Sequence, residues 1–501
     1  MRPPRPWAFA AGDGLALILG ALLPLAFAPF GFWLLAVVLP AGLLWLWEGI
    51  TPRRAAWRGW LFGLGLHGVG VSWIYISLHR YGHAPAAFAA LTTLLLILYL
   101  ALYPAAVGWL LGRFFPRPGP VRYLLAAPAL WTLLEWVRSW LLSGFPWLSP
   151  GYSQIDSPLR GLAPLLGVFG VGWALLLSAG LLLILMRGRQ WRWGALLALL
   201  WAGGWGLDQI PWTRPAGAPL RVALVQGNID QNQKFQSGQV QRTLGLYLEL
   251  SDGVPRPDLI IWPETAVPVY YDNAVDGFFA PLAQRARQAG VDYLIGVPAG
   301  SRDSGVFHNA VVSVGSAHGF YHKRRLVPFG EYLPLRWLLM FFRDFVDIPL
   351  GDFTAGGVDQ PLLQAAGQPL GMSICFEAVF GSEIRRSLPA ARLLVNVSND
   401  AWFGDSLAPH QHLEINRMRA LEAGRWLARA TNTGITALID QRGRIVVRGG
   451  QFVATVVEGN LQPRRGATPY VRFGDAPVVA LAGLGLGLAF YLSLSRWRQV
   501  T

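Results

Sequence analysis

The sequence contains one cysteine, and the thiol of this residue is a candidate nucleophile because of its chemistry and its place in the chain. Cys375 is the only cysteine among 501 residues, so it makes no intrachain disulfide and no cysteine-based zinc site. The apolar residues that alternate through 369–374 predict a β-strand ending at the thiol. The simpler alternative is a small buried core residue, since unpaired cysteine is among the most buried residue types. A nucleophilic role therefore depends on partner groups elsewhere in the chain.

Two charged residues, a glutamate and a lysine, also lie at or just beyond the ends of strand-like segments. Glu264 comes just after the apolar run 259–262, and Lys323 is one of two lysines in an arginine-rich chain. Cysteine reacts as the thiolate, a buried carboxylate can take the thiol proton, and an ammonium group can stabilise an oxyanion. Glu264, Lys323 and Cys375 together predict acyl transfer through a thioester. Taken singly, Glu264 could be a strand-end cap and Lys323 a surface charge.

The elements that position these residues belong to a membrane protein. Hydrophobic residues make up 53% of the chain and charged residues only 14%, with a mean hydropathy of +0.37, which predicts membrane spans. A chain of 501 residues also needs at least two domains. The net charge of +14 does not indicate nucleic acid binding, because the arginines lie in short clusters between apolar stretches.

Seven apolar stretches precede residue 208 and an eighth lies near the C-terminus. We place them near 12–29, 32–47, 59–77, 85–111, 121–142, 163–186, 193–207 and 476–494. Arginine clusters occupy alternate loops, and basic loops lie on the cytoplasmic side. We therefore expect both termini in the cytoplasm and the segment between spans seven and eight on the outer, periplasmic face. A cleaved signal peptide ending near Ala28 is an alternative for the first span.

The long segment between spans seven and eight changes in character. Prolines at 211, 215 and 219 mark a linker, after which short strand-like runs alternate with amphipathic helical stretches. This pattern predicts an α/β domain of about 260 residues, a usual size for one catalytic unit. The predicted organisation is thus a helical bundle at 1–207, a catalytic domain at 208–475, and an eighth helix with a cytoplasmic tail at 476–501.

Some polar residues have both structural and functional interpretations. His67 lies among glycines inside a span, where helix packing is the favoured interpretation. Glu135 and Arg138 are spaced i, i+3 and can pair, with a functional role left open. His410 and His412 could suggest a metal site, but no third ligand is evident and a place at the start of a helix is favoured. We expect no metal and no cofactor.

Several motifs carry a family resemblance. The W-P-E-T of 262–265, the Y-H-K of 321–323 and the C-F-E of 375–377 resemble the Glu-Lys-Cys triad of the nitrilase/amidase superfamily. The motifs at 135–148, 326–334 and 398–403, with the added membrane bundle, are similar to the apolipoprotein N-acyltransferase family over nearly the whole chain. The resemblance implies eight spans and a periplasmic αββα-sandwich domain in the bacterial cytoplasmic membrane.

The resemblance also implies an activity and residue roles. It implies acyl transfer from a phospholipid to the α-amino group of a lipoprotein's N-terminal diacylglyceryl-cysteine, by a ping-pong route. The implied roles are Glu264 as general base, Lys323 as oxyanion stabiliser, Cys375 as nucleophile, and Glu331 and Glu377 as further essential acids. Phe376 stands where relatives often have tyrosine, and its backbone N–H would complete the oxyanion hole. Phe235 stands where relatives can have tryptophan beside the substrate.

An apolar segment at 333–350 has two interpretations. It follows Lys323 and Glu331, and its apolar residues occupy most faces of a helix. One interpretation is a core helix of the α/β domain. The other is an arm that dips into the outer leaflet and cradles the acyl chain through Trp337, Phe341 and Phe342.

Two other functions compete with the acyltransferase. A membrane-tethered amidase or nitrilase would use the same triad with water as the acceptor. A transporter with an accessory domain is disfavoured, because the sequence shows no internal repeat and few polar residues inside spans. The expected partners are a phospholipid acyl donor, a diacylated apolipoprotein acceptor and the bilayer, with no nucleic acid, and the protein is expected to be a monomer.

Overall fold

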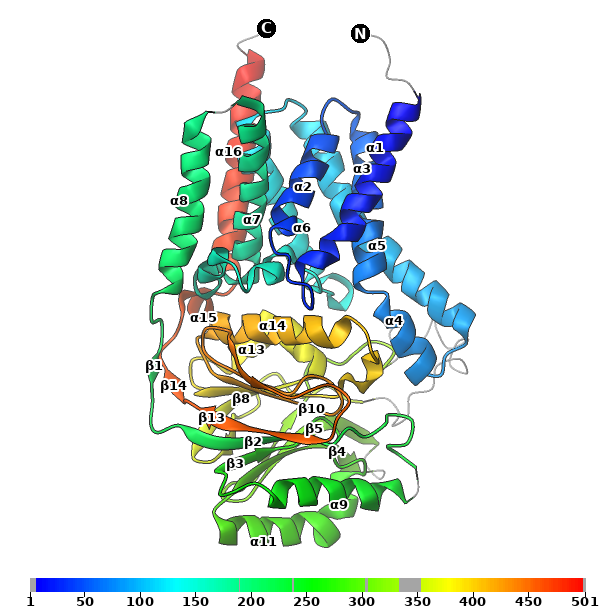
Figure 1. The fold of residues 1–501 in the computed structure, drawn as a ribbon, viewed down its shortest axis with the longest axis vertical. Coiled ribbons are helices and arrows are strands. Elements are labelled where there is room, and N and C mark those ends of the chain that lie inside the picture. The colour runs from blue at the N-terminus through cyan, green and yellow to red at the C-terminus, as the bar shows by residue number, and fades with distance from the viewer. Residues whose placement is uncertain (1–5, 189, 237, 302–304, 333–352, 499–501) are drawn as a thin grey trace. The chain divides into compact units, whose positions relative to one another are not determined.

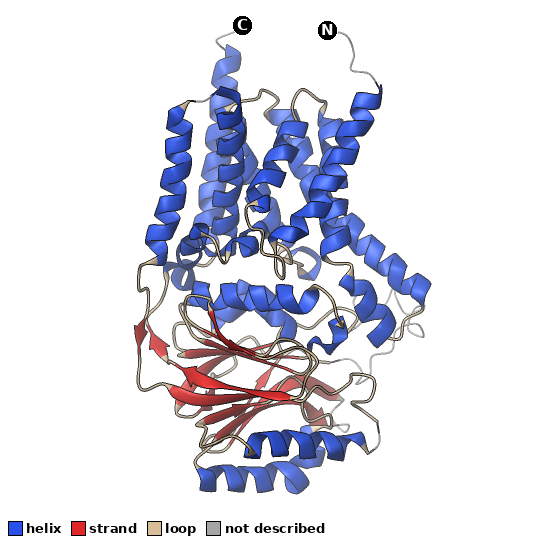
Figure 2. Ribbon diagram, in the orientation of Figure 1, coloured by secondary structure: helices blue, strands red, loops and turns tan. Residues whose placement is uncertain are grey.

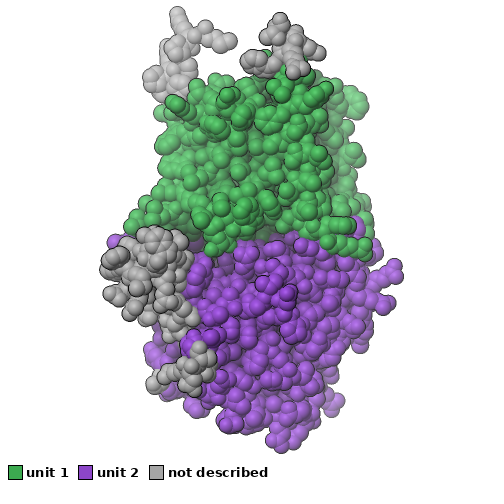
Figure 3. Space-filling model, turned by 180° about the vertical axis from the view of Figure 1, so that it is seen from behind, with its two compact units in different colours: residues 1–73, 90–210, 472–501 green, residues 74–89, 211–471 purple. Residues whose placement is uncertain are grey.

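The computed structural model describes residues 6–188, 190–236, 238–301, 305–332 and 353–498. The chain divides into two compact units (Figure 3). The first contains residues 1–73, 90–210 and 472–501, and the second contains 74–89 and 211–471. Residues 74–89 thus group with the second unit, whereas the sequence-based division at 207 and 475 stays a prediction.

The first unit is a helical bundle whose helices begin and end at recognisable signals (Figures 1 and 2). Its main helices are α1 (Pro6–Leu22), α2 (Leu35–Leu46), α3 (Pro52–Gly70), α5 (Ala86–Phe114), α6 (Ala127–Arg138), α7 (Ala163–Gly188), α8 (Trp191–Asp208) and α16 (Ala476–Arg498). Thr51 caps α3 by accepting a hydrogen bond from the Arg54 backbone N–H, and Pro52 occupies the first turn. Gly167 interrupts α7 with a φ of +68°, a conformation that favours glycine.

Not all the predicted spans are long apolar helices. Three helical segments among the described residues are long and apolar enough to cross a membrane: 86–114, 158–188 and 476–495. A bent pair, 52–70 with 73–81, would make a fourth, and two shorter apolar helices cover 10–26 and 35–46. The prediction of an apolar helical bundle is therefore confirmed, and the count of eight spans stays a prediction. Length limits the count: α2 has 12 residues, against about 20 for a full span.

The Glu135–Arg138 pair has a structural task. Arg138 is almost fully buried and forms an ion pair with Glu135 on α6. Its guanidinium also donates to the backbone carbonyls of Phe145 and Trp147, at 2.6 and 2.8 Å. The pair thereby anchors the aromatic loop that follows α6. His67 also has a local contact, 3.0 Å from the Gly63 carbonyl, which agrees with a packing role.

The second unit is a sandwich of two six-stranded sheets (Figure 1). The first sheet has the order β13-β2-β3-β4-β5-β6, and the second has the order β12-β11-β10-β9-β8-β7. The strands of the first are β13 (Thr455–Leu461), β2 (Leu220–Gln226), β3 (Leu259–Ile261), β4 (Asp292–Ser301), β5 (Val306–Val314) and β6 (Gly319–His322). Those of the second are β12 (Ile445–Arg448), β11 (Ala437–Ile439), β10 (Leu427–Thr431), β9 (Leu393–Ser398), β8 (Gln368–Ile374) and β7 (Leu363–Ala365).

Helices cover both outer faces of this sandwich. Helices α9 (Gln239–Asp252) and α11 (Ala280–Ala289) pack on the first sheet, and α13 (Gly381–Arg386) and α14 (Ala408–Ala423) pack on the second (Figures 1 and 2). The central strands are covered on both faces, so β8 and β9 read as nearly continuous buried runs. This is the αββα architecture expected for the catalytic domain.

The topology brings the chemical residues toward one end of the sandwich. β2, β3 and β4 are parallel neighbours in one sheet, and β8, β9 and β10 are parallel neighbours in the other. The apolar residues between the sheets, among them Leu224, Ile261, Ile374 and Val395, form one core that includes Cys375. Carboxyl ends of parallel strands share an edge, so segments that follow these strands can meet there.

Candidate active site

Cys375 occupies a strained turn at the end of a buried strand. It directly follows β8 and begins the short helix η9 (Cys375–Val379), with a φ of +52°. A non-glycine residue in this left-handed region costs about 1–2 kcal/mol, so surrounding contacts must hold it there. The residue is 8% exposed. The prediction of a strand that ends at the thiol is confirmed.

Glu264 lies three residues after β3 and accepts hydrogen bonds at both carboxylate oxygens. Its Oε1 accepts from Asn309 Nδ2 at 2.7 Å and from Lys323 Nζ at 3.3 Å. Its Oε2 accepts from the Asn399 backbone N–H at 2.8 Å. The carboxylate is therefore held in one orientation by donors from three separate segments.

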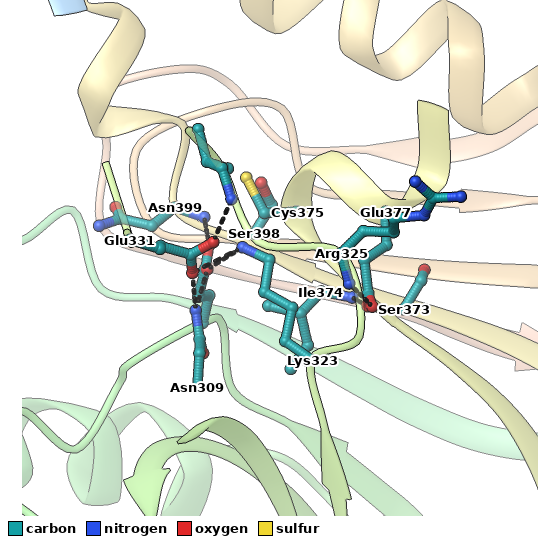
Figure 4. Close-up of polar contacts among 12 residues, drawn as sticks. Asn309, Lys323, Arg325, Glu331, Ser373, Ile374, Cys375, Glu377, Ser398 and Asn399 are labelled. Atoms are coloured by element: carbon teal, nitrogen blue, oxygen red, sulfur yellow. Dashed lines mark hydrogen bonds and ion pairs between the residues drawn. The ribbon is translucent and has the colours of Figure 1, made fainter. Parts of the chain in front are cut away.

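Lys323 follows β6 and lies between two carboxylates, with only 1% of its side chain exposed. Besides Glu264, its Nζ contacts Glu331 Oε1 at 2.9 Å (Figure 4). The Asn309 amide bridges both acids, because Nδ2 also donates to Glu331 Oε1 at 2.7 Å. Glu331 is in turn fixed by the Val327 backbone N–H, 2.8 Å from its Oε2. The structure thus brings Glu264, Lys323 and Glu331 into direct contact.

The charges of the cluster determine the resting protonation state. Burial alone would lower the pKa of Lys323, but Glu264 and Glu331 raise that pKa above its ordinary value, so Lys323 stays an ammonium group. Burial, with Glu264 adding, raises the pKa of the Cys375 thiol, and Lys323 opposes the shift. The resting cysteine is therefore a thiol. The carboxylates of Glu264 and Asp400 both act electrostatically on this thiol, with Glu264 the larger contributor.

Glu377 ties the cysteine turn to the segment that carries Lys323. It is fully buried and accepts from the backbone N–H groups of Ile374 (2.7 Å), Arg324 (2.6 Å) and Arg325 (3.1 Å), and from the Tyr321 hydroxyl (3.0 Å). Burial raises the pKa of Glu377 to about 7, against these backbone donors and the charge of Lys323, which favour the carboxylate. Glu377 therefore fixes the segments that carry two predicted catalytic residues.

A small cavity of about 60 Å³ opens beside the cluster. Its lining residues are Gln231, Lys234, Phe235, Glu264, Thr265, Asn309, Gly330, Glu331, Phe353, Asn399 and Trp402. Phe235, predicted to lie beside the substrate, is among them. The placement of Phe235 agrees with that prediction, and its role stays a prediction.

Lys234 is a lining residue that sequence reasoning passed over. It is buried, and its Nζ donates to the Glu264 backbone carbonyl at 3.3 Å. Burial lowers the pKa of Lys234 to about 8, although the charge of Glu264 opposes the shift. The signal was present in the sequence, because Lys234 is the second of two lysines in an arginine-rich chain.

The other residues predicted to bind substrate or support catalysis are either outside the described residues or near the cysteine turn. Trp337, Phe341 and Phe342 lie outside the described residues, as does all of the predicted arm at 333–350. Phe376 is half-buried and packs edge-on against Phe380, with ring centroids 5.2 Å apart. Within the described ranges, no three or more His, Cys, Asp or Glu side chains are grouped as metal ligands would be.

Comparisons with known proteins agree with this architecture. The family model for the apolipoprotein N-acyltransferase N-terminal domain matches residues 19–181, and the carbon-nitrogen hydrolase model matches residues 221–470. An apolipoprotein N-acyltransferase of Methylococcus capsulatus is 49% identical over 482 residues, which cover 95% of each chain. This chain belongs to the apolipoprotein N-acyltransferase family.

Other relatives support the same assignment. The apolipoprotein N-acyltransferase of Nitrosomonas europaea is 46% identical over 94% of this chain and 95% of its own. That of Azotobacter vinelandii is 46% identical over 95% of this chain and 94% of its own. The predicted membership of an acyltransferase family with a nitrilase-like domain is confirmed, and neither the hydrolase nor the transporter alternative is supported.

Proposed function

We propose that this chain moves a fatty acyl group from a phospholipid to the α-amino group of a lipoprotein's N-terminal diacylglyceryl-cysteine. The names of the relatives supply the apolipoprotein acceptor and N-acylation. The observation that carries the catalytic assignment is the sole thiol, on a left-handed turn, interacting with the buried cluster of Glu264 and Lys323. A phospholipid is a suitable donor because the chain carries helices able to lie in its bilayer.

In the first half-reaction, Glu264 takes the thiol proton as Cys375 Sγ attacks the ester carbonyl of the donor. The new C–S bond produces a tetrahedral oxyanion, which the Lys323 ammonium group stabilises together with the Phe376 backbone N–H. The intermediate then breaks the ester C–O bond, and Glu264 returns the proton to the departing glycerol oxygen. The products are a lysophospholipid and a thioester on Cys375.

In the second half-reaction, the acceptor amine attacks the thioester carbonyl. Glu264 takes one amine proton, and the same oxyanion donors act on the second tetrahedral intermediate. The C–S bond breaks, the sulfur regains a proton, and an amide remains on the lipoprotein. One general base can serve both half-reactions, because in each half-reaction one proton is taken from the nucleophile and one is returned to the leaving group.

The protein is proposed to work as a monomer in the bacterial cytoplasmic membrane, with residues 208–475 on the periplasmic side. The arginine-rich loops support this orientation. A single chain contains all the groups assigned here, because Glu264, Lys323, Glu331 and Cys375 come from one sandwich.

The test follows the acyl group itself. Purified protein incubated with phospholipid should gain one acyl mass on the peptide that contains Cys375, and a diacylated lipopeptide should then remove it. Cys375→Ala should abolish both steps. Cys375→Ser should be nearly as poor, because a hydroxyl's pKa lies far above a thiol's. Lipopeptide acylation by the alanine variant would defeat the thioester route, and loss of the acyl group to water alone would favour a hydrolase.

A further inference from the structure

The backbone carbonyl of Cys375 is held by two fully buried side chains. His412 Nε2, on α14, lies 3.1 Å from the Cys375 oxygen, and Asn396 Nδ2, on β9, lies 3.4 Å from it. A carbonyl oxygen only accepts hydrogen bonds, so His412 must carry its proton on Nε2. Sequence reasoning placed His412 near a helix start and gave it no further task.

The contacts of the other ring nitrogen of His412 show which residue holds the ring in place. Nδ1 lies 3.1 Å from Arg429 Nη2 and 3.2 Å from Asp400 Oδ1. With the proton on Nε2, a neutral ring accepts at Nδ1, so Arg429 is the donor. Burial, followed by the charge of Arg429, lowers the pKa of His412 and keeps the ring neutral. Arg429 is itself fixed, because its Nη2 contacts Asp400 Oδ2 at 2.6 Å.

A serine completes this network. Ser398 Oγ donates to Asp400 Oδ1 at 2.7 Å. Ser398, Asp400, His412 and Arg429 are all fully or almost fully buried. A satisfied buried polar network is rigid and specifies one arrangement. This one holds the Cys375 carbonyl in place through His412.

The geometry of a peptide gives the network a consequence for catalysis. A trans peptide is planar, so its C=O and its N–H point in opposite directions. When His412 holds the Cys375 carbonyl, it also fixes the direction of the Phe376 N–H in the same peptide. The left-handed φ of Cys375 makes such a restraint necessary, because that conformation persists only where surrounding contacts hold it.

We propose that His412, held by Arg429, which Asp400 fixes in turn, is a positioning residue that aims the Phe376 N–H at the oxyanion formed during both half-reactions. This inference rests on the proposed function, because it requires an acyl group on Cys375. Its consequence is specific: loss of the His412 contact should weaken steps that pass through an oxyanion, and leave the reactivity of the sulfur in other steps largely intact.

Substitutions at two histidines of the same helix test the proposal. His412→Leu removes the donor, and the rate of Cys375 acylation by phospholipid should fall about 10²–10³-fold, the scale for one lost oxyanion donor, with little change in KM. His412→Gln can place an amide N–H near the former Nε2, so most of the rate should return. His410→Leu, on the half-buried histidine two residues earlier, is the control and should leave the rate unchanged.

Alkylation separates positioning from a general loss of structure. Iodoacetamide forms a C–S bond and expels iodide without an oxyanion, and its product is unambiguous because the chain has one cysteine. In His412→Leu, alkylation should stay within about threefold of wild type while acylation falls by the larger factor. Equal losses in both reactions, or full acylation by this variant, would overturn the inference. Failure of the wild type to acquire an acyl group would instead overturn the proposed function.

Discussion

Lys323 is surrounded by groups that preserve its charge and leave little room for a larger side chain. Its Nζ contacts Glu331 at 2.9 Å and Glu264 at 3.3 Å, and the Asn309 amide bridges the two acids. A compact ammonium group fits between the two carboxylates, whereas a planar guanidinium is larger and directs its donors differently. At the scale of one residue, the site therefore selects a lysine in an otherwise arginine-rich protein.

Two replacements of Lys323 should show whether acylation depends on the charge of this side chain alone or also on its shape. Lys323→Met should slow acyl-enzyme formation about 10²–10³-fold, because the proposed oxyanion stabiliser is lost. Lys323→Arg keeps the charge and should not restore the rate. Time-resolved mass measurement of the Cys375 peptide after phospholipid addition provides the rates. Wild-type acylation in the arginine variant would show that Lys323 is peripheral.

Lys234 should give the protein a stability that depends on pH. Its folded pKa of about 8 lies below the ordinary lysine value of 10.5, so the folded state binds fewer protons between these pH values. Stability should therefore rise with pH across that window, and below it the buried ammonium group is a cost. Lys234→Met should accordingly be more stable than wild type by on the order of 1–3 kcal/mol near pH 7.

The advantage of Lys234→Met should shrink as pH rises from 8 to 10. Thermal unfolding in detergent, followed at several pH values, measures the difference. A difference that does not vary with pH would contradict the lowered pKa of Lys234.

At the scale of elements, the segment that carries Glu264 packs directly on a neighbouring strand. Gly296 lies in β4, and a Cβ there would come within 2.2 Å of the Pro263 carbonyl oxygen and 2.7 Å of Glu264 Cα. Both are backbone atoms, so the segment after β3 would have to move. The close approach of two backbones therefore fixes the position of Glu264, the proposed general base, and only glycine permits it.

Gly296→Ala should displace Glu264 and lower activity. We expect a loss of about 1–3 kcal/mol of stability from overpacking, with a larger effect on acylation, because the base moves relative to the thiol. Gly245→Ala is the matched control, since nothing lies within 4 Å of its added Cβ and it sits in helix α9, where alanine is favoured. Unchanged acylation in Gly296→Ala would show that the packing does not set the base position.

At the scale of the whole molecule, the orientation in the membrane rests on the arginine loops. Labelling can test the predicted outer placement of the sandwich in a Cys375→Ala background. A cysteine at the exposed Gln288, on α11, should react with an impermeant thiol reagent on intact spheroplasts. A cysteine at the exposed Pro118, between two predicted spans, should react only after the membrane is opened. The reverse pattern would invert the topology and contradict the proposed lipoprotein acceptor.

Much of the fold and of the candidate site of this protein could be predicted from its sequence. The apolar helices and the alternating α/β segment follow from hydrophobic periodicity, which is a local property of the chain. The thiol at the end of β8 and the lysine after β6 stood out because the chain has one cysteine and only two lysines, and Glu264 stood out by its place after β3. Family motifs then linked these residues to acyl transfer. The roles of the predicted residues stay predictions until the experiments above are done.

Only the tertiary structure determined which groups surround those residues. The Asn399 N–H reaches Glu264 across 135 positions of sequence, and the His412 ring reaches the Cys375 carbonyl across 37. Periodicity and spacing report which face of an element is buried, but they do not report which distant element packs against it. A hydrogen bond depends on placement to within a few tenths of an ångström. That placement is set when the two sheets and their covering helices pack together, which is why the contacts of Lys234 and His412 are known only from the fold.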